Sequence, residues 1–138
     1  MMATLEELNA RLKGFWPDVL GMHFTEIGDK RLHARVDVRH ELLAPNGYLH
    51  AGAIVTLADT VCGIGCIINL PSTASGFTTI ELKSNFLGTA LGGTITCEGS
   101  LVHGGRSTQV WDAVVVNEQT GQKIAVFRAT QMVLYPRA

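Results

Sequence analysis

The chain has 138 residues, of which 46% are hydrophobic and 17% charged, with 11 Lys and Arg against 12 Asp and Glu. This length supports one well-buried core and is too short for two ordinary domains, so residues 1–138 are expected to form a single domain. A formal net charge of -1 excludes an overall basic field, and with it binding that depends on neutralising many phosphates. No nucleic-acid partner is expected.

The beginning of the chain lacks both the apolar run of a signal peptide and the Arg-rich bias of a transit peptide. Three cysteines, an odd number, favour reduced thiols over a disulfide framework. Cys62 and Cys66 are four residues apart and Cys97 is distant, a spacing that matches no common zinc motif. We therefore predict a cytoplasmic protein with core cysteines and no metal site.

The first elements are a helix and a hairpin. Within residues 1–14, Thr4 is a candidate N-cap, leucines follow at helical spacing and Gly14 is a stop signal, which predicts an N-terminal helix. Apolar and polar residues alternate from residue 23 to residue 39 around a Gly-Asp-Lys turn. This alternation predicts a β-hairpin with one solvated face.

Residues 50–69 predict a long buried central helix, because this apolar stretch holds one charged residue, Asp59, and is closed by Asn69 and Pro71. A membrane span is the alternative, since about 20 apolar residues would cross a bilayer. Asp59 near the middle, and flanks without basic or aromatic anchors, favour a core helix. No membrane association is expected.

The remainder of the chain is β-like in four segments, at residues 77–86, 94–102, 107–117 and 123–134. These segments predict a meander of four strands. Together with the early hairpin and the central helix, they indicate an α+β domain in which an antiparallel sheet covers the helix.

Asp59 is the most informative residue of the sequence, because an ionised carboxylate in an apolar helix is costly unless it is solvated or paired. Two interpretations remain. The side chain faces a subunit boundary or caps a neighbouring backbone, or it lines a cleft as a nucleophile or general base.

The start of the central helix is a second candidate site. A turn-forming segment ends at His50, and the N–H groups of Ala51 and Gly52 at the helix N-terminus are suited to a developing oxyanion. His50 is either a capping or packing residue or a part of this site. The other four histidines show no metal-ligand spacing and are expected to be surface or structural residues.

These residues resemble the signature of a known family. Residues 47–52 read Gly-Tyr-Leu-His-Ala-Gly, and Asp59 follows His50 by nine residues. The pattern is similar to the G-x-x-H-G-G…D/E motif of hotdog-fold acyl-CoA thioesterases of the phenylacetate-pathway and 4-hydroxybenzoyl-CoA type. The similarity extends from about residue 20 to residue 134. It implies the hotdog fold, an antiparallel sheet wrapped around a long central helix, and acyl-CoA thioesterase activity.

The resemblance also implies roles for individual residues. Asp59 would be the catalytic carboxylate, the Ala51 N–H would polarise the thioester carbonyl, and His50 would be an orienting group at the helix start. Thr79 lies where the family often has a hydroxyl near the attacking water.

Two positions depart from the family pattern. Ala51 replaces the first glycine of H-G-G, which leaves the backbone donor intact if φ is helical. Ala44 occupies the position six before His50, where related enzymes often carry Asn or Gln. Asn46 is the candidate to supply the missing amide.

The spacing along the helix requires two chains. Ala51 and Asp59 are eight residues apart, which is about 12 Å at 1.5 Å per residue. Two groups so far apart cannot both act on one carbonyl, because attack needs a separation of roughly 3 to 3.5 Å. If both act on the same thioester, they come from different chains. We therefore expect a homodimer, or a dimer of dimers, with sites at the subunit interface, as the resemblance also implies.

Coenzyme A is implied by the resemblance as part of the substrate, since the sequence has no phosphate-binding glycine motif. Gly105, Arg106 and Ser107 could offer backbone donors and a guanidinium to a phosphate, and Lys83 is a weaker candidate. An ordinary hairpin turn with a solvated arginine is the alternative. No separate cofactor is expected.

The sequence thus predicts thioester hydrolysis without metal or redox cofactor, in which Asp59 attacks the carbonyl carbon or activates a water. A non-catalytic acyl-CoA-binding hotdog module is the alternative. A hydratase is less favoured, because His50 does not lie in a hydratase signature. The acyl group is not identified, and Phe77, Leu87 and Trp111 are candidates to shape its pocket.

Overall fold

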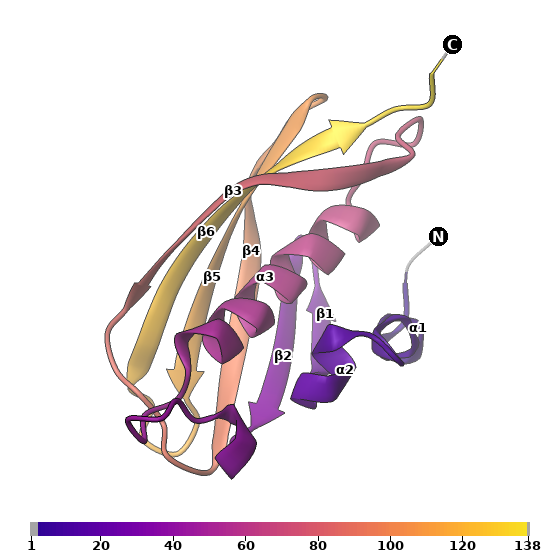
Figure 1. Ribbon diagram of the computed structural model, residues 1–138. Coiled ribbons are helices and arrows are strands. Elements are labelled where there is room, and N and C mark those ends of the chain that lie inside the picture. Colours follow the sequence, from indigo (N-terminus) through magenta and orange to yellow (C-terminus); the bar gives the residue numbers. More distant parts are fainter. Residues whose placement is uncertain (1–2, 138) are drawn as a thin grey trace.

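Six antiparallel strands form one curved sheet, and a long helix lies across its inner face (Figure 1). The computed structural model describes residues 3–137. The helices are α1 (Leu5–Leu12), α2 (Trp16–Leu20) and α3 (Ala51–Ile68), with a short 3-10 helix at His40–Leu42. The strands are β1 (His23–Gly28), β2 (Arg31–Asp37), β3 (Gly76–Phe86), β4 (Thr94–Gly104), β5 (Thr108–Asn117) and β6 (Lys123–Leu134). This architecture confirms the predicted hotdog class.

The predicted meander of four late strands is wrong in one pairing. The sheet order is β1-β2-β4-β5-β6-β3, so β4, β5 and β6 follow one another but β3 pairs with β6 at the edge. Helix α3 carries the chain from β2 across the sheet to its far edge, which leaves β2 free to pair with β4. Alternation of apolar and polar residues identifies a strand but does not report its neighbour.

The predicted N-terminal helix is confirmed as α1, where the Thr4 side chain and Glu7 form a capping box; residues 1–2 of that prediction lie outside the described part. The five-residue α2 was not predicted, because it is too short for helical periodicity to show. Pro17 is in its first turn, and Gly21 ends it in the left-handed region with φ 85°. The Arg39 guanidinium donates to the last carbonyls of α2.

The core lies between α3 and the sheet. Leu32, Ala34 and Val36 alternate inward on β2, as the hairpin pattern predicted, and all three cysteines are buried and unbridged. Glycines let α3 approach the sheet closely: a Cβ on Gly65 would lie 2.6 Å from the ring of Trp111. Trp111 is fully buried and its indole N–H donates to Gln109, so the ring cannot move aside.

Helix α3 confirms the predicted central helix, with His50 as its N-cap. It is long and apolar enough to cross a membrane by length and composition, but half of it is buried inside the fold. The rest is less completely covered: Val55, Ile64 and Ile68 pack against the core but are only partly buried, and Ile67 is also partly buried. The covered half packs like the core helix of a globular domain.

Strand β3 is an open edge. It pairs with β6 on one side only, and most of its side chains are exposed, including Ile80 at 54% and Leu82 at 40%. An 11-residue edge strand with apolar side chains is a template for pairing with another chain. Strand β3 also lies against α3.

We predict that Gly65→Ala destabilises the protein, although alanine is the better helix former. The added Cβ would meet the fixed Trp111 ring, and overpacking of about 1–3 kcal/mol exceeds a propensity gain of about 1 kcal/mol. Urea unfolding measures the difference. Gly63→Ala is the matched control, because its Cβ would lie 3.1 Å from one atom of Phe77 and should cost less. Equal stability of the two variants would contradict the packing assignment.

Candidate active site

A short hydrogen-bonded loop places His50 at the start of α3. The Asn46 side chain accepts from the Tyr48 N–H, Gly47 has φ 89°, and the Ala44 N–H donates to the Tyr48 carbonyl at 2.7 Å. The His50 N–H donates to the Leu42 carbonyl at 3.0 Å. The side-chain oxygen of Asn46 therefore closes the loop.

His50 caps the helix with its own ring. Its Nδ1 accepts from the Gly52 N–H at 2.7 Å, so the neutral ring carries its proton on Nε2. The Gly52 N–H is engaged and is not the free donor that the sequence suggested. Within residues 3–137 the Ala51 N–H makes no hydrogen bond, which leaves it as the free donor at the helix N-terminus.

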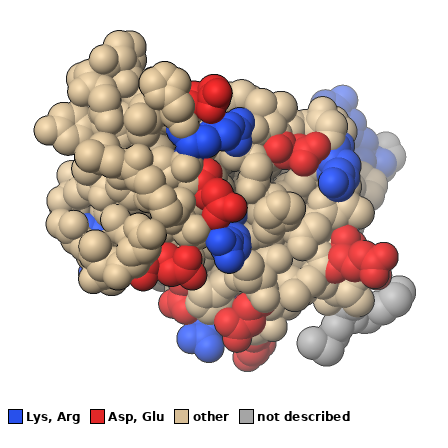
Figure 2. All heavy atoms as spheres, turned by 90° about the horizontal axis from the view of Figure 1, so that it is seen from below, with Lys and Arg blue, Asp and Glu red and all other residues tan. Residues whose placement is uncertain are grey.

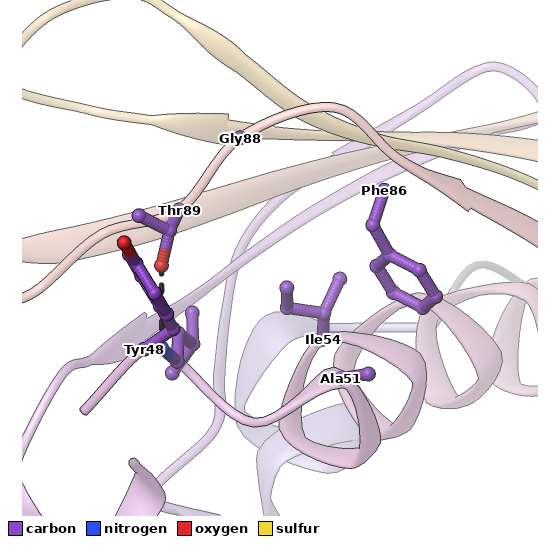
Figure 3. A pocket seen from close by; sticks show the side chains of 7 residues that line it. Tyr48, Ala51, Ile54, Phe86, Gly88 and Thr89 are labelled. Atoms are coloured by element: carbon purple, nitrogen blue, oxygen red, sulfur yellow. Dashed lines mark hydrogen bonds between the residues drawn. The ribbon is translucent and has the colours of Figure 1, made fainter. Parts of the chain in front are cut away.

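An apolar cavity of about 400 Å³ opens beside Ala51 (Figure 3). It lies between the first turns of α3 and the segment that follows β3, and it is lined by Tyr48, Leu49, Ala51, Ile54, Phe86, Gly88 and Thr89. The Thr89 hydroxyl accepts from the Leu49 N–H at 3.2 Å and so ties the two sides together. If the Ala51 N–H bound a carbonyl oxygen, the apolar cavity would lie next to that carbonyl.

Asp59 lies two turns further along α3 and does not line this cavity. Its side chain is partly buried, and its Oδ1 is buried without a hydrogen-bond partner in the described chain. Burial raises the pKa of this carboxyl above its usual range. Within residues 3–137 the carboxylate is therefore neither a cap nor one half of an ion pair. Its separation from Ala51 is that of one continuous helix, as expected.

Two further candidates lie on opposite faces of β3. Thr79 pairs with the fully buried Gln131, so it lies on the same face of the sheet as α3. Lys83 pairs with Arg128 and lines a depression on the outer face with Asp112, to which the Arg128 guanidinium donates. The structure therefore does not bring Lys83 to the Ala51 cavity.

The hairpin between β4 and β5 carries Gly105, Arg106 and Ser107. Arg106 is exposed, and a Cβ on Gly105 would lie 2.8 Å from the exposed His103 ring and 3.2 Å from the Thr108 carbonyl oxygen, so the turn is tightly packed at this position. The hairpin lies beside the C-terminal end of β6, at the opposite end of the sheet from the start of α3. No described arrangement of three or more His, Cys, Asp or Glu side chains could hold a metal ion.

The three residues that the sequence suggested for an acyl pocket do not line the cavity beside Ala51. Trp111 belongs to the core, Phe77 packs against Gly63, and Leu87 does not line the cavity. Phe86 and Tyr48 line it instead. Thr89 was also missed, because a lone threonine in a glycine-rich loop carries no sequence signal. Tyr48 could have been predicted from the sequence, because it lies only two residues before His50.

Gly52 faces a different hollow from Ala51. It borders a second cavity of about 330 Å³ between α2 and α3, with His50 and Trp16 among its lining residues. The Trp16 indole N–H donates to the Thr56 hydroxyl at 2.9 Å, and that hydroxyl donates to the Gly52 carbonyl.

On the face of the molecule shown in Figure 2, positively and negatively charged side chains are mixed, and neither sign forms a patch of its own.

Comparison with known proteins identifies the family. A family model described as the thioesterase superfamily matches residues 46–124, which include the helix start, α3 and β3. The chain belongs to the thioesterase superfamily. It is a thioester hydrolase with the hotdog fold.

Individual relatives match over most of their length. The chain is 30% identical to PA1618 of Pseudomonas aeruginosa over 94% of this chain and 89% of that protein. A crystal structure of a mutant of this thioesterase superposes with a TM-score of 0.93 over 99% of this chain and 97% of that one. The proofreading thioesterase EntH of Cronobacter turicensis is 30% identical over 95% of this chain and 94% of EntH.

Two other proteins carry names that mention coenzyme A. The 1,4-dihydroxy-2-naphthoyl-CoA hydrolase of Listeria monocytogenes is 26% identical over 82% of this chain and 90% of that protein. The structure of smu.793 from Streptococcus mutans, bound to acetyl CoA, is 30% identical with a TM-score of 0.74 over 85% of this chain and 91% of that one.

We predict that Asp59→Asn raises the melting temperature at pH 7 by a few degrees. The folded state raises the pKa of this carboxyl, so folding is disfavoured above that pKa, where the group is ionised, and the penalty fades as pH falls below it. The gain should therefore be largest at neutral pH and vanish in acid, as thermal unfolding across pH would show. Asp29→Asn, at an exposed hairpin, is the control. A lower melting temperature at pH 7 would show that the carboxylate is stabilised in the native protein.

Proposed function

We propose that the chain hydrolyses thioesters of coenzyme A at sites shared between two copies of the chain. The observation that carries this proposal is the free Ala51 N–H at the start of an 18-residue helix, beside an apolar cavity, on the same helix as an unpartnered carboxylate. A helix N-terminus favours negative charge, so this N–H stabilises the oxyanion that forms when a thioester carbonyl is attacked.

The open edge of β3 supports the dimer. Two copies of β3 can pair about a two-fold axis, which makes the strands antiparallel and the sheet continuous. The pairing would bury exposed apolar side chains of β3 and bring the partner close to α3, which β3 contacts. A dimer is the smallest assembly that meets this requirement, and a dimer of dimers meets it equally.

An antiparallel arrangement also brings opposite ends of the two chains together. Ala51 and Arg106 lie at opposite ends of one chain, separated by a helix of about 27 Å. In the dimer, Ala51 of one chain would approach the half of the partner that contains Asp59 and the β4–β5 hairpin. One site would then combine the Ala51 N–H with the carboxylate and the arginine of the other copy.

The proposed chemistry needs one water and no cofactor. In the general-base route the Asp59 carboxylate takes a proton from water, the water oxygen bonds to the carbonyl carbon, the C–S bond breaks, and the thiolate of coenzyme A takes up the proton. In the nucleophilic route the Asp59 carboxylate bonds to the carbonyl carbon, the C–S bond breaks and the thiolate of coenzyme A leaves. Water then hydrolyses the resulting anhydride, which releases the acid and regenerates the carboxylate, and the thiolate takes up the proton from the water. Thr79 would orient the water. The His50 ring would act by capping the start of α3 from the hollow between α2 and α3.

The nucleotide of coenzyme A would lie at the hairpin. The Arg106 guanidinium can bind phosphate through two parallel hydrogen bonds, and Gly105 and Ser107 offer backbone donors. The names of the Listeria relative and of the smu.793 complex support coenzyme A as the carrier of the acyl group. The apolar lining beside Ala51 would hold the acyl group, and a cytoplasmic location suits reduced thiols.

We predict that Arg106→Ala raises KM for an acyl-CoA about tenfold or more, because a charge-assisted contact to phosphate is lost. KM for the same acyl group on a truncated thioester that ends at pantetheine should change little. Steady-state release of free thiol measures both. Arg31→Ala, at an exposed arginine outside the hairpin, is the control. Equal effects on the two substrates would remove Arg106 from nucleotide binding.

The shared site predicts complementation. Asp59→Asn and Ala51→Pro chains should each be inactive, while mixed dimers regain activity, because one of their two sites combines an intact carboxylate with an intact N–H. Proline fits the first helical turn, and His50 is extended at φ -64° and ψ 132°, as a residue before proline requires.

Ala51→Gly retains the N–H and should stay active as the matched control. Subunit exchange is shown by differential tagging of the two chains. With exchange shown and no activity regained, the site lies within one chain and the shared-site proposal is wrong.

A further inference from the structure

The segment Val133–Tyr135 is attached to the tip of the β4–β5 hairpin, and we call it the C-terminal strap. The Val133 N–H donates to the Ser107 carbonyl at 2.9 Å, and the Tyr135 hydroxyl donates to the Arg106 carbonyl. Two successive carbonyls of the hairpin turn are therefore bonded by the strap.

The strap is itself fixed on its other side. The Leu134 carbonyl accepts from the Ser75 N–H at 2.8 Å and from the Ser75 hydroxyl at 3.2 Å, at the start of β3. Tyr135 is partly buried just beyond the end of β6. The hairpin tip is thus tied through the strap to the edge of the sheet that we assign to the dimer.

The bonded carbonyls determine which groups of the turn are free. A trans peptide points its carbonyl and the following N–H in opposite directions, so the Ser107 N–H points away from Tyr135. Within the described chain neither this N–H nor the Arg106 guanidinium makes a hydrogen bond, and Arg106 has no acidic partner. The turn presents a free guanidinium and a free N–H while its carbonyl oxygens, which would repel an anion, are turned to the strap.

We propose that Tyr135 is a positioning residue that holds Arg106 and the Ser107 N–H ready for the phosphates of coenzyme A. This inference rests on the proposed function. Fixing the backbone of a flexible arginine before binding reduces the conformational entropy lost on binding, so the hydroxyl acts on KM and not on the chemical step. Tyr135 does not touch the substrate and acts through Arg106.

The test is Tyr135→Phe, which removes the hydroxyl and retains the ring. KM for an acyl-CoA should rise about three- to tenfold with kcat unchanged, which is the effect of one lost hydrogen bond. KM for the pantetheine-truncated thioester should stay the same. Ser75→Ala is the matched control, because it removes a hydroxyl that bonds the same strap at Leu134 and not the hairpin. Thermal unfolding of each variant shows that the fold is retained.

The double variant Arg106→Ala with Tyr135→Phe decides whether Tyr135 acts through Arg106. Its KM for acyl-CoA should equal that of Arg106→Ala alone. Additive effects, or an equal rise of KM for the truncated substrate, would overturn the positioning role. If KM for acyl-CoA rises in Arg106→Ala but does not change in Tyr135→Phe, this inference is overturned while the proposed contact between Arg106 and the nucleotide stands. No effect of Arg106→Ala would overturn the nucleotide contact itself and the inference with it.

Discussion

Helix α3 is apolar on nearly every side, and half of it is buried inside one chain. Part of the rest is only partly buried, and β3, which contacts α3, has an edge without a strand partner in the described chain. Burial of apolar area is the dominant favourable term in folding and association, so this constraint favours a second copy of the chain. Asp59 lies on the same helix, so the packing of α3 also determines the surroundings of the proposed catalytic carboxylate.

The start and the middle of α3 have different roles in this arrangement. At its start, the ring of His50 satisfies the Gly52 N–H and leaves the Ala51 N–H free beside a cavity. Two turns later, Asp59 is held in a partly buried place where its carboxylate is costly. Burying a charged group at a functional site commonly lowers the stability of the fold in exchange for activity. The buried Oδ1 without a hydrogen-bond partner is consistent with such a site.

The glycines of α3 and the C-terminal strap each fix the position of one part of the proposed site. Gly63 and Gly65 let the helix approach Phe77 and Trp111, which fixes the height of Asp59 above the sheet. The strap fixes the β4–β5 hairpin at the far end. A substrate as long as coenzyme A needs both ends of such a site to be rigid, because the thioester is positioned by contacts remote from it.

The sequence by itself determined the class of fold and the central helix, and it predicted a backbone donor at the helix start and a site shared by two chains. Each of these follows from local chemistry: apolar runs, capping residues and a helical rise that separates residue 51 from residue 59. Only the tertiary structure decided that β3 pairs with β6, that the Gly52 N–H is occupied, and that Phe86 rather than Trp111 lines the cavity. Those facts depend on which strands become neighbours and on which way the side chains face. Both are determined by contacts between residues that are far apart in the chain.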